Sequence, residues 1–290
     1  MNRPNLPFWL FFFSCLTILL FRELFREGMF MDGMLYTSVG KNLADGLGTF
    51  WHPHFSKTAM SVFHEQPPLM FGMLAVFFKI FGSSIYVERI YGLIIALVTC
   101  YLFIKIWKCI LPEGTQRKIS WLPLFLWLSI PVCFWSYSNN LEEPTMGVFD
   151  MAAVLFISRA MIKNNRPYLN IVIAGLMIIA ASMCKGFQGL FPLAAIFIYW
   201  IIFKNSSFSK MLFLSTLLLS IVFIFYVVIL MNPVVFSSYE MYINARIVKT
   251  FMDPAPTHTQ RFYLVKQFFS EMIPVFIILF IGISVCQRSV

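Results

Sequence analysis

The chain has 290 residues, of which 59% are hydrophobic and only 12% are charged. Soluble domains carry about 25% charged residues, so this composition excludes an ordinary soluble domain. The net charge of +9 does not indicate nucleic-acid binding, because Lys and Arg lie mainly at the ends of apolar segments and in short loops. The composition therefore predicts an all-α integral membrane protein.

Crossing the hydrocarbon core of a bilayer takes about 20 mostly apolar residues. On this criterion we expect about eight transmembrane helices, in a single polytopic membrane domain over residues 1–290. In chain order the candidate spans are Pro7–Phe21, Ser84–Trp107, Trp121–Tyr137, Thr145–Ile162, Leu169–Cys184, Phe187–Phe203, Met211–Met231 and Ile273–Cys286. Arg22 follows the first span without a small-residue cleavage motif, so we expect a retained helix and no removed signal peptide.

The charges between the spans predict an orientation. Three short junctions are basic, whereas the junction 138–144 holds two Glu and no base. The positive-inside rule puts the basic junctions in the cytoplasm and the acidic junction outside, and the same alternation places two long loops, 22–83 and 232–272, outside as well. In the first of these loops, Met34–Leu47 and Leu69–Phe81 have the apolar spacing of amphipathic helices that lie in the membrane interface.

Carboxylates gather at the predicted outer face. Asp32 begins an amphipathic stretch just beyond the first span, and Glu142 and Glu143 begin a later span. A structural interpretation exists for each, since Asp favours helix N-caps and the helix dipole stabilises acids in the first turn. However, carboxylates beside hydrocarbon tend to face a cavity or a site, where they can act as general bases. These three acids are therefore the candidate catalytic residues.

Two cations lie on the same predicted face. Lys185 interrupts the apolar run between Leu169 and Phe203 at its outer turn, and Arg246 lies in the second long loop. Taken singly, each fits a cation that snorkels to the interface. Beside an acidic cluster they would also suit the phosphate of a lipid donor, to which Arg offers bidentate donors and Lys a point charge.

Histidines in the first outer loop raise the question of a metal. His52, His54 and His64 share this loop with Asp32, and a His-x-His pair with a carboxylate can supply three ligands. The alternative is that they are ordinary interfacial histidines beside aromatic residues. We therefore assign no metal ligand and require no cofactor, and leave a divalent metal open.

A series of short motifs runs through nearly all of the chain. Its members are Asp32 with Tyr36, His64–Leu69 with its Pro-Pro-Leu, Phe81-Gly82, Arg89, the acids before Pro144, Lys185-Gly186, Tyr239-Glu240 with Arg246, and His258–Tyr263 followed by Pro274. In order and topology the series resembles the integral membrane glycosyltransferases of the GT-C fold. It looks closest to family 39, which holds the protein O-mannosyltransferases and the bacterial lipid A aminoarabinose transferase.

The resemblance implies a transferase of the inner or plasma membrane that moves a sugar from a polyprenyl or dolichyl phosphate to an extracytoplasmic acceptor, with inversion at the anomeric carbon. The acceptor would be a protein, a lipid or a cell-envelope glycan. The essential acid of such families matches Asp32, and the assisting acid matches Glu143, with Glu142 as the alternative. Arg246 and Lys185 match the cations that bind the lipid phosphate. Further candidates for substrate binding are Tyr36, His64, Tyr239 and His258.

Two features depart from the family pattern. Gln66 precedes Pro-Pro where the aminoarabinose branch has Lys, so one phosphate ligand is missing or supplied elsewhere. The sequence stops at Val290, without the extracytoplasmic C-terminal domain usual in the family, as a fragment, a compact relative or an inactive truncated member would. The residues also leave room for a transporter or flippase of lipid-linked sugars and for a scaffolding subunit, although a transporter would place polar residues near the bilayer midplane.

Overall fold

The computed structural model describes residues 5–114, 118–164, 166–204, 206–252 and 262–288, and these form helices and no β-strand. The predicted all-α class is therefore confirmed. In chain order the helices are α1 (Leu6–Leu16), η1 (Thr17–Phe21), α2 (Arg22–Leu24), α3 (Met31–Ala44), α4 (Leu69–Phe81), α5 (Val87–Ile110), α7 (Trp121–Leu128), α8 (Pro131–Ser138), α9 (Glu142–Ser158), η2 (Arg159–Lys163), α10 (Pro167–Lys185), η3 (Gly186–Ala194), α11 (Ala195–Phe203), α12 (Phe208–Leu230), α13 (Pro233–Tyr242), η4 (Ile243–Val248), α14 (Lys249–Met252) and α15 (Tyr263–Arg288).

Several of these helices are long and apolar enough to cross a bilayer, as an integral membrane protein requires. In the described part of the chain there are five such stretches, and six if α7 and α8 together form one span. The stretches are Val87–Ile110, Glu142–Lys163, Pro167–Phe203, Phe208–Leu230 and Tyr263–Ile281. The expected count of eight is not confirmed, partly because Leu6–Phe21 is shorter than a full span.

The predicted span Trp121–Tyr137 is broken in the structure. Its two halves, α7 and α8, are bent by 79°. Pro131 begins α8 and lacks an N–H for the preceding turn, and Ile130 before it takes an extended ψ of 115°. A residue before proline is biased away from helical geometry, which accounts for the bend.

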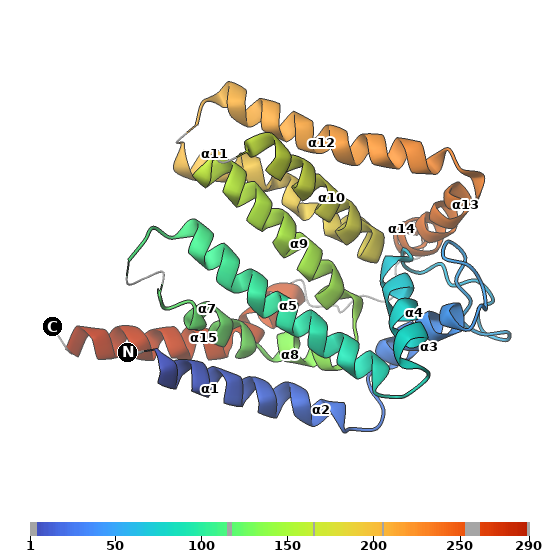
Figure 1. Cartoon of the computed structure of the whole chain (residues 1–290), viewed down its shortest axis with the longest axis horizontal. Coiled ribbons are helices and arrows are strands. Elements are labelled where there is room, and N and C mark those ends of the chain that lie inside the picture. Colours follow the sequence, from blue (N-terminus) through green and yellow to red (C-terminus); the bar gives the residue numbers. More distant parts are fainter. Residues whose placement is uncertain (1–4, 115–117, 165, 205, 253–261, 289–290) are drawn as a thin grey trace.

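The apolar run Pro167–Phe203 is a hairpin. α10 ends at Gly186, whose φ of 65° few side chains tolerate. A Cβ on Gly189 would lie 2.4 Å from the carbonyl carbon of Ala181, so the chain after the turn doubles back on α10. Figure 1 shows α11 returning to the end at which α10 begins. The returning arm has nine residues of 3-10 helix and nine of α-helix, which reach about 31 Å and so match the hydrocarbon thickness.

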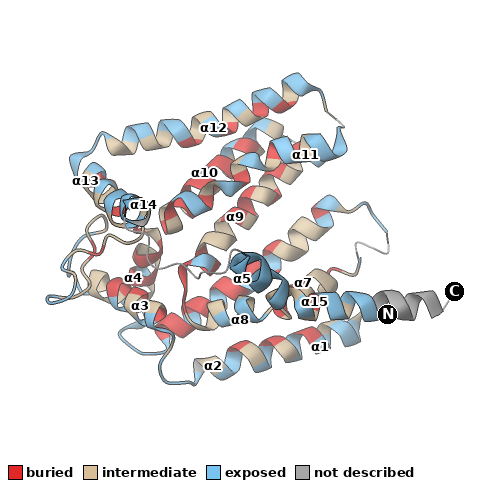
Figure 2. Ribbon diagram, turned by 180° about the vertical axis from the view of Figure 1, so that it is seen from behind, coloured by how far each residue is buried: buried red, intermediate tan, exposed pale blue. Residues whose placement is uncertain are grey.

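The centre of the bundle is made by α9, α10 and α12. Their shared core contains large aliphatic side chains such as Ile171, Ile178 and Leu214 together with small residues such as Ala153 and Ala174. Small residues let membrane helices approach closely, which replaces the hydrophobic driving force that lipid removes. The outward faces of the helices are largely exposed and apolar, as expected for surfaces that meet lipid (Figure 2).

The long loops gather at one end of the bundle, which we call the outer-loop end. It carries α3, α4, α13 and the Gly186 turn, whereas the basic junctions after α5, η2 and α11 lie at the opposite end (Figure 1).

The two helices predicted in the first long loop are confirmed. The first of them, α3, begins at Met31, three residues before the predicted Met34. Residues 232–252, expected as loop, are mostly helical, and α15 begins at Tyr263, ten residues before the predicted Ile273. A Cβ on Gly40 of α3 would lie 2.7 Å from Cβ of Leu74, so the missing side chain lets α3 and α4 cross in contact.

Candidate functional site

Three contacts fix α3 against the acidic junction before α9. The backbone N–H of Phe30 donates to Oδ1 of Asn139 at 2.7 Å, and the amide of Asn140 donates to the hydroxyl oxygen of Thr37 at 2.9 Å. Gly33 faces the carbonyl oxygen of Asn139 so closely that a Cβ would lie 1.9 Å from it. The first turn of α3 therefore lies beside the first turn of α9, which brings residues about 110 positions apart in sequence into one site.

Glu142 is the most deeply buried acid of the site. It is the first residue of α9, its side chain is 0% exposed, and neither carboxylate oxygen has a hydrogen-bond partner among the described residues. The N-terminal end of the α9 dipole favours its negative charge. It also interacts electrostatically with Lys185, Glu143, Arg246 and Asp32. Burying an ion costs several kcal/mol unless partners compensate, so Glu142 needs either a cation or a ligand nearby.

Lys185 supplies that cation. Its ammonium lies 3.9 Å from Oε2 of Glu142 and donates a hydrogen bond to Oε1 of Glu143. The Lys185 side chain is 12% exposed and the Glu143 side chain is 49% exposed. Because Lys185 is the last residue before the Gly186 turn, the hairpin delivers its ammonium to the first turn of α9. The structure thus brings together two predicted catalytic acids and one predicted phosphate ligand.

Asp32 and Tyr36 lie one turn apart on α3 and face this cluster. Asp32 is the second residue of the helix and Phe30 is its N-cap, so the N-cap interpretation of Asp32 is wrong. Asp32 is half-buried, and in the described part of the chain its carboxylate has no ion pair or hydrogen bond, so it can accept a proton or bind a ligand. Tyr36 packs on the rings of Phe63 and Phe71.

The hydroxyl of Tyr36 stays protonated in this setting. Burial, followed by the charges of Glu142, Asp32 and Glu143, raises the pKa of Tyr36 well above its ordinary value, while Arg246 opposes the shift. A phenol that cannot ionise serves as a hydrogen-bond donor rather than as a base. The same charges show that the hydroxyl lies within electrostatic reach of both the acids and Arg246.

Arg246 joins the second long loop to the first. It lies in the π-helical segment η4, its NH2 group donates to Oε2 of Glu65 at 3.0 Å, and its Nε donates to the Glu65 carbonyl at 3.2 Å. Glu65 stands directly before Gln66 and the Pro-Pro turn, whose two prolines fix its backbone. Sequence reasoning did not single out Glu65, although it is the one acid of that turn.

The remaining predicted residues are less tightly grouped. His64 is half-buried, and its ring Nδ1 hydrogen-bonds the Val62 carbonyl at 2.9 Å. Tyr239 lies on α13, with its ring 6.1 Å from that of Trp51 and 5.8 Å from that of Tyr226. His258 lies outside the described residues.

Histidines do not assemble a metal centre in the described ranges. The ring Nδ1 of His54 is hydrogen-bonded to the carbonyl oxygen of Ser61 at 2.6 Å, so this nitrogen already has a partner. No group of three or more His, Cys, Asp or Glu side chains among those that the structure describes is placed to hold a metal ion. Among the described residues, no set of ligands supports a metal site at His52 and His54.

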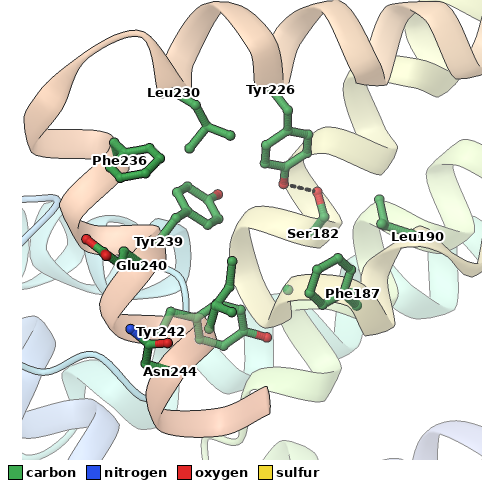
Figure 3. Close-up of a pocket in the computed structure, with 12 residues that line it drawn as sticks. Ser182, Phe187, Leu190, Tyr226, Leu230, Phe236, Tyr239, Glu240, Tyr242 and Asn244 are labelled. Carbon is green, nitrogen blue, oxygen red and sulfur yellow. Dashed lines mark hydrogen bonds between the residues drawn. The ribbon is translucent and has the colours of Figure 1, made fainter. Parts of the chain in front are cut away.

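An apolar cavity of about 420 Å³ lies at the hairpin turn that follows Lys185 (Figure 3). Its walls come from the hairpin turn, the end of α12, α13 and η4, and they are Ser182, Gly186, Phe187, Leu190, Tyr226, Leu230, Phe236, Tyr239, Glu240, Tyr242, Ile243 and Asn244. The Tyr226 and Ser182 hydroxyls are hydrogen-bonded to each other at 2.6 Å, whereas the buried Tyr239 hydroxyl has no hydrogen-bond partner among the described residues. Such a cavity suits a hydrocarbon chain better than a polar ligand.

Tyr242 forms the boundary between this cavity and the charged residues. A Cβ on Gly186 would lie 2.0 Å from its hydroxyl oxygen, so a larger residue there would displace the Tyr242 ring. Burial and then the charge of Glu142 raise the pKa of Tyr242, while Arg246 lowers it. Tyr242 therefore stays neutral within reach of both an acid and a cation of the site. Its position at the end of α13, against the hairpin, was not predicted, because nothing in the sequence pairs it with Gly186.

The chain is similar to known proteins in both sequence and structure. A family model described as dolichyl-phosphate-mannose-protein mannosyltransferase matches residues 65–230, which is more than half of the chain. The chain is similar in structure to ArnT from Cupriavidus metallidurans bound to undecaprenyl phosphate, with a TM-score of 0.68 and 14% sequence identity over 91% of this chain and 48% of that one. For ArnT in the apo state the TM-score is 0.63 and the identity 15%, with the same coverage. No curated protein sequence gives a match.

The similarity to the two ArnT structures lies in the fold. At such low identity the similarity to ArnT concerns the fold, and it confirms the GT-C-like architecture expected from the sequence. The chain spans about half the length of the ArnT chains that it matches.

Proposed function

Because the chain belongs to the dolichyl-phosphate-mannose-protein mannosyltransferase family, we propose that it is a membrane glycosyltransferase that moves a sugar from a polyprenyl phosphate to an extracytoplasmic acceptor. One observation carries the proposal. Three carboxylates, Asp32, Glu142 and Glu143, lie within electrostatic reach of one another and of two cations, Lys185 and Arg246, and Glu142 and Arg246 also reach Tyr242 in the wall of an apolar cavity. A reaction that expels a lipid phosphate needs a base, a cationic clamp and room for the lipid chain.

The donor would bind across the boundary between charge and cavity. Lys185 and Arg246 would hold its phosphate, and the first units of its chain would enter the cavity between α12, α13 and the hairpin turn. The binding of undecaprenyl phosphate by ArnT, whose fold this chain shares, supports this choice of donor. Tyr36, His64, Tyr239 and His258 stay candidates for contacts to the sugar or the lipid.

The transfer would be a single displacement. The acceptor hydroxyl or amine attacks the anomeric carbon while Asp32 takes its proton, and the bond from that carbon to the phosphate oxygen breaks. The electron pair leaves with the lipid phosphate, whose charge Lys185 and Arg246 stabilise. Attack opposite to the leaving group inverts the anomeric centre. Glu143, at the more exposed side of the cluster, would orient the acceptor, with Glu142 as the alternative.

The ion pairs of the two cations support a way in which the phosphate would be admitted. Both cations are already engaged, Lys185 by Glu143 and Arg246 by Glu65. Because Glu143 and Glu65 are partly exposed, each can turn toward water when a phosphate arrives. The departure of Glu143 from Lys185 would also free that carboxylate for the acceptor. Binding of the donor and preparation of the acceptor side would thus be coupled.

The test is transfer by the purified full chain in proteoliposomes that contain a radiolabelled polyprenyl-phosphate sugar and a cell-envelope extract as acceptor source. Asp32→Asn should abolish the release of polyprenyl phosphate without lowering thermal stability. Asp45→Asn, which removes an exposed acid at the other end of α3, should leave release unchanged. Undiminished release by Asp32→Asn would exclude the base assigned here. Movement of the labelled lipid across the bilayer without release would instead favour a flippase.

A further inference from the structure

A second cavity, of about 580 Å³, lies between the segment η1–α2 and α8. It shares no lining residue with the apolar cavity at the hairpin turn. Figures 1 and 2 place α1 and α2 on the side of the bundle away from α12, and α12 contributes lining residues to the apolar cavity only. The transferase reaction proposed above makes no use of this second cavity.

The lining of the second cavity is divided into an apolar and a charged part. Ile18 and Leu19 of η1 and the rings of Phe134 and Trp135 line one part. The charged part, which we call the rim, consists of Arg22, Glu23, Arg26 and Glu27. The segment η1–α2 runs toward the outer-loop end, so its apolar residues lie deeper along its axis than the charged residues (Figure 1). This order is that of a membrane lipid, with its chains below and its head above.

Two charges on the rim are available to a ligand. Arg26 is paired with Glu23 at 3.5 Å. Arg22 and Glu27 are exposed, and neither has an ion-pair or hydrogen-bond partner for its side chain among the described residues. An unpaired guanidinium complements a phosphate, and an unpaired carboxylate complements an ammonium group that can donate N–H bonds. Arg22 can therefore pair with the phosphate, and Glu27 with the ammonium, of a zwitterionic lipid head group.

The rim is held in place before any ligand binds. The guanidinium of the buried Arg89 donates to the carbonyls of Arg26 and Gly28, and also to that of Ser138 on α8 at 2.6 Å. It thereby ties both walls of the cavity together. Ile18, which lines the apolar part, is itself 67% exposed, so that part of the cavity is open at the surface of the protein. A lipid could enter from the bilayer without a change in the fold.

We propose that this cavity binds a zwitterionic membrane lipid whose head carries a phosphate and a primary ammonium. Arg22 binds the phosphate, Glu27 accepts from the ammonium, and the glycerol end of the chains lies on Trp135 and Phe134. Phe30 lines the same cavity, and its backbone N–H donates to Oδ1 of Asn139. A bound lipid therefore also stabilises the turn that leads into α3.

The test is native mass spectrometry of the full chain titrated with phosphatidylethanolamine or with phosphatidylglycerol of identical chains. We expect one molecule of phosphatidylethanolamine to bind at least fivefold more tightly than phosphatidylglycerol. The double variant Arg22→Gln/Glu27→Gln should lose this preference. The control Lys79→Gln/Glu113→Gln, which also removes one cation and one anion but outside the cavity, should keep it.

A second variant keeps the test decisive if the double variant is unstable. Glu27→Gln alone leaves Arg22 on the rim, and the preference should turn toward the anionic phosphatidylglycerol. Equal or tighter binding of phosphatidylglycerol by the unaltered chain, or an unchanged preference in Glu27→Gln, would overturn the proposal. None of these measurements depends on sugar transfer, so a failure here is separate from a failure of the proposed activity.

Discussion

Removing the cation beside Glu142 tests the electrostatics of the site most directly. In Lys185→Met the hydrocarbon stem is retained and the ammonium is lost. The ammonium lies 3.9 Å from the fully buried Glu142 carboxylate. At an effective dielectric constant of about 20, that separation corresponds to roughly 4 kcal/mol. Removing one partner of a buried ion pair typically costs about 3–5 kcal/mol, because the other charge is left without compensation.

We therefore expect Lys185→Met to lower the free energy of unfolding by about 3–5 kcal/mol at a pH where Glu142 is ionised, and by less at a pH where it is protonated. Adding Glu142→Gln should recover most of that loss, since the uncompensated charge disappears. Glu143→Gln removes the other acid that contacts Lys185, but it is half-exposed, and its loss should cost less than about 1 kcal/mol. Unfolding of the four proteins in mixed micelles of increasing denaturing detergent measures these differences. If Lys185→Met is as stable as the unaltered chain, or if Glu142→Gln fails to rescue it, the buried pair is not the stabilising interaction.

Further predictions concern the glycine contact, the Glu65 pair and the Pro-Pro turn. Gly33→Ala should lower stability by about 1–3 kcal/mol, because its Cβ would lie 1.9 Å from a backbone carbonyl oxygen, whereas Gly147→Ala, with no atom within 4 Å, should cost nothing in thermal unfolding. Glu65→Gln should raise the affinity for polyprenyl phosphate about threefold by removing the carboxylate charge that pairs with Arg246, and titration of the lipid into the detergent-purified chain would contradict this if affinity fell. Gln66→Lys should strengthen the same binding by a similar factor, and an unchanged dissociation constant would place this side chain away from the phosphate.

The helices could be predicted from the sequence where one physical signal dominates. α4 begins and ends where the apolar stretch Leu69–Phe81 does, and the reversal after α10 falls at the predicted Lys185-Gly186 break. The membrane spans were harder to predict where a proline changes the backbone conformation of the residue before it. The 79° bend before Pro131 divides a stretch that hydropathy treats as continuous, because hydropathy does not register the extended backbone of Ile130.

The sequence predicted which charged residues belong to the site, but not which of them contact one another. Charge at a membrane face singled out Asp32, Glu142 and Lys185, since such residues are costly there unless they have a use. The partner of Arg246 is 181 residues away, and no local pattern connects it to Glu65. Asn139 and Asn140 position α3 through side-chain hydrogen bonds, and isolated Asn residues are so common in turns that no local signal distinguishes these two.

The mixed winding of the returning arm of the hairpin gives it an adjustable length. A residue in a 3-10 helix advances about 0.5 Å further than one in an α-helix, so rewinding the nine residues of η3 would shorten the arm by about 4.5 Å. That is close to the difference in hydrocarbon thickness between thin and thick biological membranes, which is about 5 Å. The arm could follow a thinner bilayer by changing its hydrogen bonds, with α10 unaltered beside it. Infrared spectra of the full chain in short-chain and long-chain bilayers would detect this conversion as a change in the ratio of 3-10 to α-helix.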